Sequence, residues 1–330
     1  MRKSNFSRSI APYVLSRLAQ LLPIVLIIVV VNFFLIRLAP GDPIAYIIGD
    51  APVPEEQVTE LRRKLGLDAP LHRQLAIYLA DILSGNFGYS FISRAPVLDV
   101  ILERLPATLL LMISQYLLAI AAGIMLGVIS ARRQGSALDT GVTLLSVVGY
   151  AVPVFWLGQM LMLVFANKFG LFPAQGMLSL RYDLGPVEKA LDVAHHLVLP
   201  ALTLAFFNLA LIARLTRSSM LQVLGLEYVI FARSKGLSER AVVYKHALRN
   251  AVLPVVTIIG MNLRTIIAGA VLTETVFAWP GLGRLTFDAI YTRDYPVLMA
   301  MFILVGIVVV LANLLTDLAY AYLDPRIRFG

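Results

Sequence analysis

A series of long apolar runs constrains this chain more than any other feature of its sequence. The hydrocarbon core of a bilayer is about 30 Å thick, so a helix that crosses it needs about 20 mostly apolar residues. Leu-Pro pairs at residues 105–106, 199–200 and 253–254 predict three helix starts, where a proline gives up no hydrogen bond. The runs predict an all-α, polytopic membrane protein with six transmembrane helices. They cover residues 13–38, 106–130, 139–165, 197–215, 251–271 and 296–322.

The composition agrees with a chain that is solvated largely by lipid. Hydrophobic residues make up 59% of the 330 positions and charged residues 15%, with a mean hydropathy of +0.81. This is more apolar surface than one soluble core can bury. The first run predicts a retained anchor, because residues 21–38 exceed the apolar part of a signal peptide and residues 39–43 form no cleavage site. The sequence has no cysteine, which excludes disulfides, thiolate metal ligands and a cysteine nucleophile.

The positive residues predict the side of the membrane on which each connection lies. Cytoplasmic loops carry an excess of Lys and Arg, but the rule holds only for connections of up to about 60 residues. With a cytoplasmic N-terminus, fifteen Lys and Arg fall in inner segments and eleven in outer segments, six of the eleven within residues 39–105. That connection is too long for the rule. Without it, fifteen inner Lys and Arg stand against five outer ones, so we expect both termini in the cytoplasm. The positive residues that give the net charge of +8 lie at the membrane edges, and no nucleic-acid motif accompanies them, so nucleic-acid binding is not expected.

Two connections are long enough to have functions of their own. The outer connection, residues 39–105, contains helix-like pieces at residues 54–65 and 71–83, and Ser84-Gly85 ends the second. It is interpreted either as a solvated cap or as a docking surface for a soluble partner. The predicted organisation is residues 1–38 as cytoplasmic N-terminus and first helix, 39–105 as the outer segment and 106–330 as a five-helix core. That core includes the second long connection, the cytoplasmic segment 216–249.

The cytoplasmic segment predicts two short helices that meet at Gly236. Residues 227–235 are helix-like with Tyr228, Phe231 and Ala232 on one side, and Gly236 can adopt the left-handed conformation that ends a helix. Ser238 can cap a second helix that runs toward Asn250. We expect a compact elbow with basic residues at its tip, which fills a groove on another protein and transmits force. The alternative is a basic loop that binds acidic lipid headgroups.

Several motifs in this chain resemble those of one transporter family. Residues 227–240 read EYVIFARSKGLSER and residues 246–254 read HALRNAVLP; together they resemble the cytoplasmic signature of ABC-importer permeases. More narrowly, they resemble the dipeptide, oligopeptide and nickel branch. The long connection after the first run is similar to that of the B-type subunit, the first of the two paired permeases. Further matching motifs are APGDP at 39–43, LGLD at 65–68, RLPATL at 104–109, VFWLG at 154–158, TETVFAWPGLG at 273–283 and DYP at 294–296.

The sequence departs from the general family pattern at two places. Ile230-Phe231-Ala232 stands where the pattern has Glu-Ala-Ala, and Leu253-Pro254 comes several residues late. Both departures are shared with the peptide branch. The resemblance implies that the coupling to an ATPase is carried by the elbow residues Glu227, Phe231, Ala232, Arg233, Lys235, Gly236, Leu237 and Arg240.

The resemblance implies an ABC type I importer permease fold and a division of labour among partners. A second homologous permease completes the pathway, two ATP-binding-cassette ATPases hold ATP and Mg, and a periplasmic or lipid-anchored binding protein delivers the solute. The chain lacks a phosphate-binding Gly-x-x-x-x-Gly-Lys-Ser/Thr loop, so it is expected to be a transport subunit without a cofactor of its own. The expected location is the bacterial inner (plasma) membrane, among its lipids. The expected solutes are short peptides, with nickel chelates, opines or glutathione as alternatives.

A few other residues are candidates for pathway, gate or metal roles. Arg264 falls mid-span, where a charge should face a partner helix or a watery cavity. The segment with Glu274, Trp279, Pro280 and Gly281 predicts a re-entrant turn or outer gate, or else a simple turn. The neighbouring histidines at 195–196 do not share a helix face, and no carboxylate pair accompanies them at ligand spacing, so a metal site is not favoured.

A transporter of another class, an ATP-independent secondary transporter, is the remaining alternative for the whole chain. Such proteins show inverted repeats and matching interrupted helices around ion-coupling groups near the membrane midplane. We find neither repeated halves nor matching interrupted helices in the sequence, and few carboxylates fall near the middle of its apolar runs. These features favour the importer permease.

Overall fold

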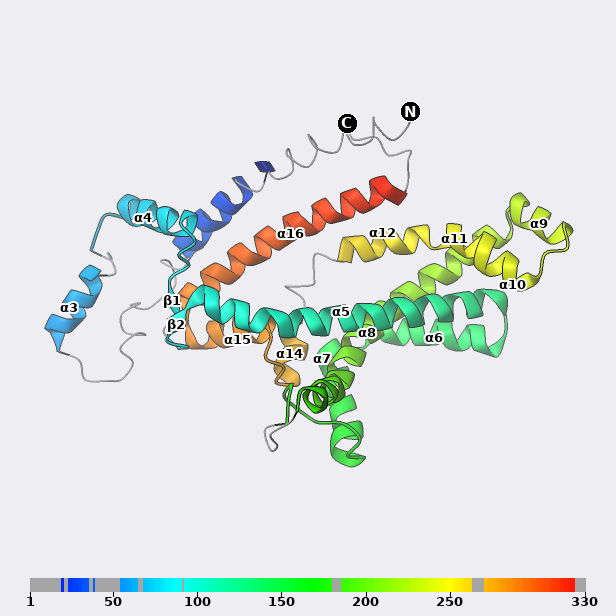
Figure 1. Ribbon diagram of the computed structural model, residues 1–330, viewed down its shortest axis with the longest axis horizontal. Helices are drawn as coiled ribbons and strands as arrows, with labels where there is room; N and C mark the ends of the chain where they lie inside the picture. The colour runs from blue at the N-terminus through cyan, green and yellow to red at the C-terminus, as the bar shows by residue number, and fades with distance from the viewer. Residues whose placement is uncertain are drawn as a thin grey trace. The chain divides into compact units, whose positions relative to one another are not determined.

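The computed structural model describes residues 19–20, 23–35, 38, 54–64, 68–90, 92–179, 185–262 and 270–323. It forms two compact units, one of residues 1–105, 285–314 and 325–330 and the other of residues 106–284 and 315–324. Figure 1 shows that the described residues are mostly helical. The helices are α3 (Glu55–Lys64), α4 (Leu71–Leu83), α5 (Val97–Arg132), α6 (Ala137–Ala151), α7 (Val154–Leu161), α8 (Pro186–Leu224), α9 (Glu227–Ser234), α10 (Glu239–Ala241), α11 (Leu248–Ala251), α12 (Leu253–Asn262), α14 (Val271–Val276), α15 (Leu282–Thr292) and α16 (Tyr295–Leu323), with π-helical segments η1 (Met162–Lys168) and η2 (Val242–Ala247).

Each of the six predicted apolar runs overlaps apolar helix in the described residues. Within the described ranges, three helices are long and apolar enough to cross a membrane, and two bent helix pairs would bring the number to five. A shorter apolar helix, Pro23–Leu35, lies in the first run. The all-α membrane fold is confirmed, whereas the count of six spans stays a prediction. The three long helices are Val97–Arg132, Pro186–Leu224 and Tyr295–Leu314, and the bent pairs are Ala137–Ala151 with Val154–Lys168 and Glu239–Ala251 with Leu253–Ile259.

The third predicted span is bent by 108° between α6 and the following helix, which α7 and η1 form together. The bend occurs at Val152 and Pro153, where Val152 is extended with φ −82° and ψ 126°. Proline has no N–H to donate and disfavours helical geometry in the residue before it, so a straight helix cannot continue through this pair. The prediction of one continuous helix over residues 139–165 is therefore wrong.

Two of the three Leu-Pro pairs do not mark helix starts. Pro106 lies inside α5, which begins at Val97, and Pro200 lies inside α8, which begins at Pro186. At the third pair, α12 begins at Leu253 as predicted. The residues before Pro106 and Pro200 are more polar than a membrane run, so a search for apolar length placed the starts of both helices too late.

A row of small residues lets α5 and α8 approach closely in the second unit. Ala119, Gly123, Gly127 and Ala131 recur every fourth position and are all buried. A Cβ atom added to Gly123 would lie 2.7 Å from Ile212 Cγ2, and one added to Gly127 would lie 2.5 Å from Thr216 Cβ. Membrane helices pack through such small residues because hydrophobic burial gives little drive within lipid.

The first unit contains a short hairpin and the predicted outer helices. α3 and α4 agree with the predicted helical pieces, and α4 is followed by Ser84 and by Gly85 at φ +82°. Strands β1 (Tyr89–Ser90) and β2 (Ala95–Pro96) then pair antiparallel, with Tyr89 opposite Pro96. The buried Asp294 carboxylate accepts a 2.5 Å hydrogen bond from Ser90 Oγ. This bond explains the placement of the Asp-Tyr-Pro motif at residues 294–296.

Candidate functional site

The elbow is built around a small apolar core of its own. Val229 and Ala232 of α9 are buried against Val242, with Val223 and Leu224 of α8 behind them. The grouping of Tyr228, Phe231 and Ala232 on one side was only partly right, because Ala232 faces the core while Tyr228 and Phe231 are exposed. A helix turns by about 100° per residue, so positions 229 and 232 share the buried stripe.

A chain of packed side chains connects the elbow with the long helices. Val243 and Ala247 of η2 belong to one buried cluster with Val128 of α5 and Met220 of α8. In Figure 1, α9 and α10 lie beyond the end of α8, near the turn between α5 and α6. α9 is therefore connected to both long helices, through η2, by contacts between buried side chains.

The elbow turns at Gly236 as the sequence predicts. Gly236 has φ +77°, and its N–H donates to the Arg233 carbonyl at 2.9 Å. A Cβ atom added at this position would meet nothing within 4 Å, so the backbone conformation, and not lack of space, requires glycine. Ser238 Oγ then accepts a hydrogen bond from the Ala241 N–H at 3.3 Å, which confirms the predicted helix cap.

The basic residues of the elbow are partly engaged within the chain. Arg233 binds Glu239 through two hydrogen bonds, Nη2 to Oε1 at 2.8 Å and Nε to Oε2 at 3.3 Å. These bonds lower the pKa of the Glu239 carboxyl and raise the pKa of the Arg233 guanidinium. The Lys235 ammonium lies 4.5 Å from the centroid of the Phe231 ring. Arg233 therefore braces the turn within the chain, and the coupling role of Arg233 and Lys235 stays a prediction.

The elbow also presents apolar side chains to solvent. Phe231 is 61% exposed and Ile230 51% exposed, and Tyr228, Leu237 and Tyr244 are also exposed. We call these five residues the elbow surface. Glu227 and Arg240 are exposed beside them. Several exposed large apolar side chains on one small, polar-flanked element are typical of a protein interaction site.

A second candidate site surrounds the buried carboxylate of Glu274. Its Oε1 accepts a hydrogen bond from Thr108 Oγ1 at 2.8 Å, and its Oε2 accepts one from the Arg284 N–H at 2.9 Å. Thr108 Oγ1 in turn accepts the Leu282 N–H at 2.7 Å. Side chains from α14 and α5 thereby satisfy the free N–H groups at the start of α15. We call this arrangement the Glu274 clasp.

The residues of the predicted gate belong to this clasp. Trp279 is fully buried, and its Nε1 donates to the Ala107 carbonyl at 2.9 Å. A Cβ atom added to Gly281 would overlap the Glu274 carboxylate. Pro280 is partly buried between them, and Ala278 has a positive φ of 50°. The segment between α14 and α15 is a tightly fixed turn, and a gating role for it stays a prediction.

A cavity of about 390 Å³ lies in the second unit, and part of its lining comes from α14. The sequence analysis missed it, although Gln115 and Asn208 are amide side chains near the middle of long apolar helices and could have indicated it. Asn208 Nδ2 donates to Gln115 Oε1 at 3.1 Å. The cavity is lined by Met112, Gln115 and Tyr116 of α5, Val154 of α7, Leu204, Phe207 and Asn208 of α8, and Val271, Leu272 and Thr273 of α14.

A partly buried ion pair near the C-terminal end of α8 was also missed. The Arg217 guanidinium binds Asp139 of α6 through Nε to Oδ1 at 2.5 Å and Nη2 to Oδ2 at 2.8 Å. Ser130 Oγ of α5 donates to the same carboxylate. Arg217 was counted only as a positive charge at the membrane edge. Its true partner lies 78 residues away, and no local pattern reveals such a pair.

The remaining candidate residues fall into two groups. Arg264 lies outside the described residues. His195 and His196 bind separate backbone carbonyls, Leu171 through Nε2 and Asp192 through Nδ1, each at 2.8 Å. Among the residues that the structure describes, no group of three or more His, Cys, Asp or Glu could hold a metal ion.

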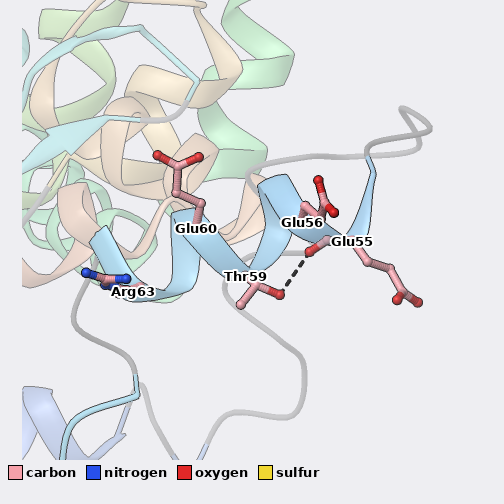
Figure 2. Close-up of a pocket in the computed structure, with 5 residues that line it drawn as sticks. All are labelled: Glu55, Glu56, Thr59, Glu60 and Arg63. Atoms are coloured by element: carbon pink, nitrogen blue, oxygen red, sulfur yellow. Dashed lines mark hydrogen bonds between the residues drawn. The ribbon is translucent and has the colours of Figure 1, made fainter.

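Acidic side chains follow the exposed helix α3 of the first unit. Figure 2 shows Glu55, Glu56, Thr59, Glu60 and Arg63 along this helix, where they line a surface depression. Thr59 Oγ1 donates to the Glu55 carbonyl at 2.9 Å. This face is available to a soluble partner, as one of the two interpretations of the outer segment requires.

Family models match both parts of the chain. The model described as "Binding-protein-dependent transport system inner membrane component" matches residues 123–329. A second model, "Binding-prot-dependent transport system membrane comp, N-term", matches residues 10–112. The two matches together include both the apolar core and the long connection of the N-terminal part.

Several transport permeases are similar to this chain over nearly its full length. The di/tripeptide transport system permease protein DppB of Pseudomonas aeruginosa is 42% identical, over 96% of this chain and 98% of the relative. The oligopeptide transport system permease protein AppB of Bacillus subtilis is 40% identical, over 97% of this chain and 100% of the relative. The dipeptide transport system permease protein DppB of Escherichia coli K12 is 39% identical, over 96% and 98%.

The fold is also found in a solved structure. A chain of the MetNI methionine ABC transporter in an inward-facing conformation matches with a TM-score of 0.53 and 17% identity. The match covers 69% of this chain and 97% of that chain. It confirms the type I importer permease fold and carries no statement about the solute.

Proposed function

Because the chain belongs to the family of binding-protein-dependent transport system inner membrane components, we propose that it is the B-type permease subunit of an ATP-driven importer of short peptides. The observation that carries this proposal is the full-length similarity, at about 40% identity, to permeases named for di/tripeptide and oligopeptide transport. The chain supplies a path through the membrane and no catalytic group. Nickel chelates, opines and glutathione become competing solutes to be tested.

The proposed partners follow from this role. A binding protein brings the peptide to the outer side, and ATPases on the cytoplasmic side supply the free energy. We further propose one second permease and two ATPases in the assembly, with ATP and Mg bound on the ATPases. The multi-pass chain lies in the bacterial inner membrane, with both termini in the cytoplasm and residues 39–105 outside, an orientation that the Lys and Arg distribution supports.

The elbow is the proposed contact with an ATPase. Three observations support this role: the exposed apolar side chains of the elbow surface, the turn fixed by Gly236 and the Arg233–Glu239 brace. Buried contacts through η2 would pass a displacement of the elbow to α5 and α8. A basic loop that only binds lipid headgroups would not need this internal core and brace. We assign the coupling role to Glu227, Phe231, Ala232, Arg233, Lys235, Gly236, Leu237 and Arg240.

The Glu274 clasp, with Trp279, Pro280 and Gly281, is the proposed fixed end against which a gate moves. It holds α14, which contributes three residues to the cavity lining, to α5 and to the start of α15. In this proposal the clasp does not touch the solute. It keeps one wall of the pathway in place while the elbow moves the other end of α5 and α8.

The proposal is tested by uptake into proteoliposomes that contain the complete transporter. Labelled dialanine, with its binding protein outside and ATP and Mg at the ATPases, should accumulate only when all components are present. A nickel chelate, an opine and glutathione are the competing solutes in parallel samples. Accumulation of dialanine by this chain alone, without ATP, would instead identify a secondary transporter.

A further inference from the structure

The cavity in the second unit is formed where two helix faces meet. Its α5 residues, Met112, Gln115 and Tyr116, are spaced at i, i+3 and i+4, and its α8 residues repeat the same spacing. Residues with this spacing share one face of a helix. Gln115 and Asn208 lie close to the middle of their helices, α5 and α8. The cavity is therefore expected near the middle of the membrane.

Two neutral amide side chains lie in the polar part of this cavity. Asn208 Nδ2 donates to Gln115 Oε1 at 3.1 Å, and Gln115 is 2% exposed. An amide in apolar surroundings is costly unless it is hydrogen-bonded, so an amide pair is expected where polar contact is needed. Each side-chain amide carries two donors and an oxygen with two lone pairs, and the bond between Gln115 and Asn208 uses one donor and one acceptor. The pair has further capacity for a ligand that also presents both a donor and an acceptor.

The chemistry of the lining excludes recognition by charge. The residues that line the cavity are apolar apart from Gln115, Tyr116, Asn208 and Thr273, and none of them is ionisable as an acid or base near neutral pH. A peptide group presents one N–H donor and one C=O acceptor, the same two kinds of group that the side-chain amides offer. This complementarity is independent of the peptide's side chains, which can lie against the apolar part of the lining.

Resting on the proposed function, we propose that Gln115 and Asn208 form a transient binding site for the main-chain amide of the transported peptide. The peptide C=O accepts a hydrogen bond from one side-chain NH₂ group, and the peptide N–H donates to one side-chain oxygen. The peptide and the two amides replace hydrogen bonds that they already make with water or with each other, so the free energy of binding is small. The peptide is thus solvated at mid-membrane without being trapped, and its sequence is not selected there.

The experiment has to distinguish the peptide from another occupant of the cavity, a helix of the second permease. A helix of the second permease could cover this face and fill the cavity with its own side chains. That arrangement predicts that loss of the amides weakens assembly of the two permeases. The proposed peptide site predicts that assembly is unchanged and that the peptide itself reaches the lining.

The experiment uses the complete transporter in proteoliposomes with its binding protein, its ATPases, ATP and Mg. The probe is a dipeptide of alanine and photoactivatable leucine, illuminated during turnover, and the labelled segments are identified by mass spectrometry. The label should map to α5 around residues 112–116 or to α8 around residues 204–208. Without ATP or without binding protein, this label should be lost.

Variants give the second measurement. Gln115→Leu and Asn208→Leu should each lower dipeptide uptake about tenfold, while yield, copurification of the second permease and ATPase activity stimulated by the binding protein stay near wild type. The matched control is Gln159→Leu, which removes an exposed amide on α7 outside the cavity lining. This control should transport normally.

The two proposals fail in different ways. If wild-type transporter accumulates the dipeptide but the label maps only to other segments, the binding site is overturned and the proposed function stands. Loss of the second permease from the Leu variants would also overturn it, by assigning the cavity to a contact between permeases. If the wild-type transporter accumulates no dipeptide while it accumulates a nickel chelate, an opine or glutathione, the peptide function fails and the binding site with it.

Discussion

Glycine is required at different positions of this chain for different physical reasons. Gly236 is required by a positive φ in open space, whereas Gly281 has no room for a Cβ because the Glu274 carboxylate fills that position. The first demand can be predicted from sequence, since a glycine between two helical patterns indicates a left-handed helix end. The second cannot, because Glu274 becomes the neighbour of Gly281 only after α14 and α15 have folded together.

At Gly236 we expect valine to uncouple transport from ATP hydrolysis. A β-branched residue at φ +77° carries a strain of about 1 to 3 kcal/mol, which is relieved when the elbow changes its angle. Dipeptide uptake should be lost while insertion and melting temperature change little, as measured in proteoliposomes and by thermal unfolding in detergent.

The control for this substitution is Gly236→Asn, because asparagine tolerates the left-handed conformation better than other residues with a Cβ. It should retain much of the uptake. Wild-type uptake by a Gly236→Val protein that still holds its ATPases would contradict the coupling role.

At Gly281 we expect even alanine to destabilise the fold. The added methyl group overlaps the Glu274 carboxylate, and relief of such overpacking typically costs about 1 to 3 kcal/mol. Thermal unfolding of the purified protein should show a lower midpoint for Gly281→Ala. Gly141→Ala is the matched control, because a Cβ at Gly141 meets nothing within 4 Å. Equal midpoints for the two variants would show that the Glu274 carboxylate can move away from the added methyl group without loss of stability.

At the scale of elements, an exposed ion pair spans the turn of the elbow. Arg233 and Glu239 have side chains that are 43% and 51% exposed, so the pair contributes only about 0.5 kcal/mol. The pKa of Glu239 is lowered by Arg233 first and by the charge of Arg132 to a smaller extent. A lowered carboxyl pKa means that the contribution is complete above the ordinary value of about 4.3 and is lost as the pH falls below it.

The expected outcome is a pH-dependent opening of the elbow. Amide hydrogen exchange in residues 227–241, corrected for the intrinsic pH dependence, should be faster at pH 3 than at pH 7. Glu239→Gln should show the fast exchange at both values, because its side chain stays neutral. A wild-type elbow whose corrected exchange is the same at both values would mean that Gly236 and the apolar core alone hold the turn.

The elements themselves were predictable to different degrees. The bounds of α3, α4 and α9 and the start of α12 follow from charge patterns, caps and Gly or Pro positions, which act within a few residues. The starts of α5 and α8 were missed, because both helices extend beyond their apolar part through residues that hydropathy does not mark. The cavity and the ion pair of Asp139 depend on contacts between distant helices, so periodicity in one helix cannot indicate them.

At the scale of the whole molecule, the orientation in the membrane is the first property to establish. We expect both termini and the elbow on the cytoplasmic side and residues 39–105 outside. The chain has no cysteine, so single cysteines at Ser84 and Ser238 provide reporters without background. An impermeant maleimide added to sealed vesicles should reach these two positions from opposite sides. Labelling of both positions from the same side would overturn the orientation.

The acidic face of α3 gives a salt-dependent prediction for the complete importer. Charge reversal at Glu55, Glu56 and Glu60 should weaken association with the binding protein, and more so at low salt, because exposed charges are screened beyond about 8 to 10 Å at physiological ionic strength. The measurement is the affinity of the binding protein for the reconstituted transporter at two salt concentrations. Charge reversal at the exposed Asp99 and Glu103 of α5 is the control. Unchanged affinity at both concentrations would leave the outer segment as a structural cap.

The elbow contains within a short stretch of chain nearly everything that gives it shape. Its turn at Gly236, its cap at Ser238, its ion pair and its core of Val229, Ala232 and Val242 all lie within sixteen consecutive positions, residues 227–242. A part with this self-sufficiency is exchangeable. A permease that received this stretch from a relative would be expected to adopt the relative's choice of ATPase and keep its own solute, so that energy source and cargo can evolve separately.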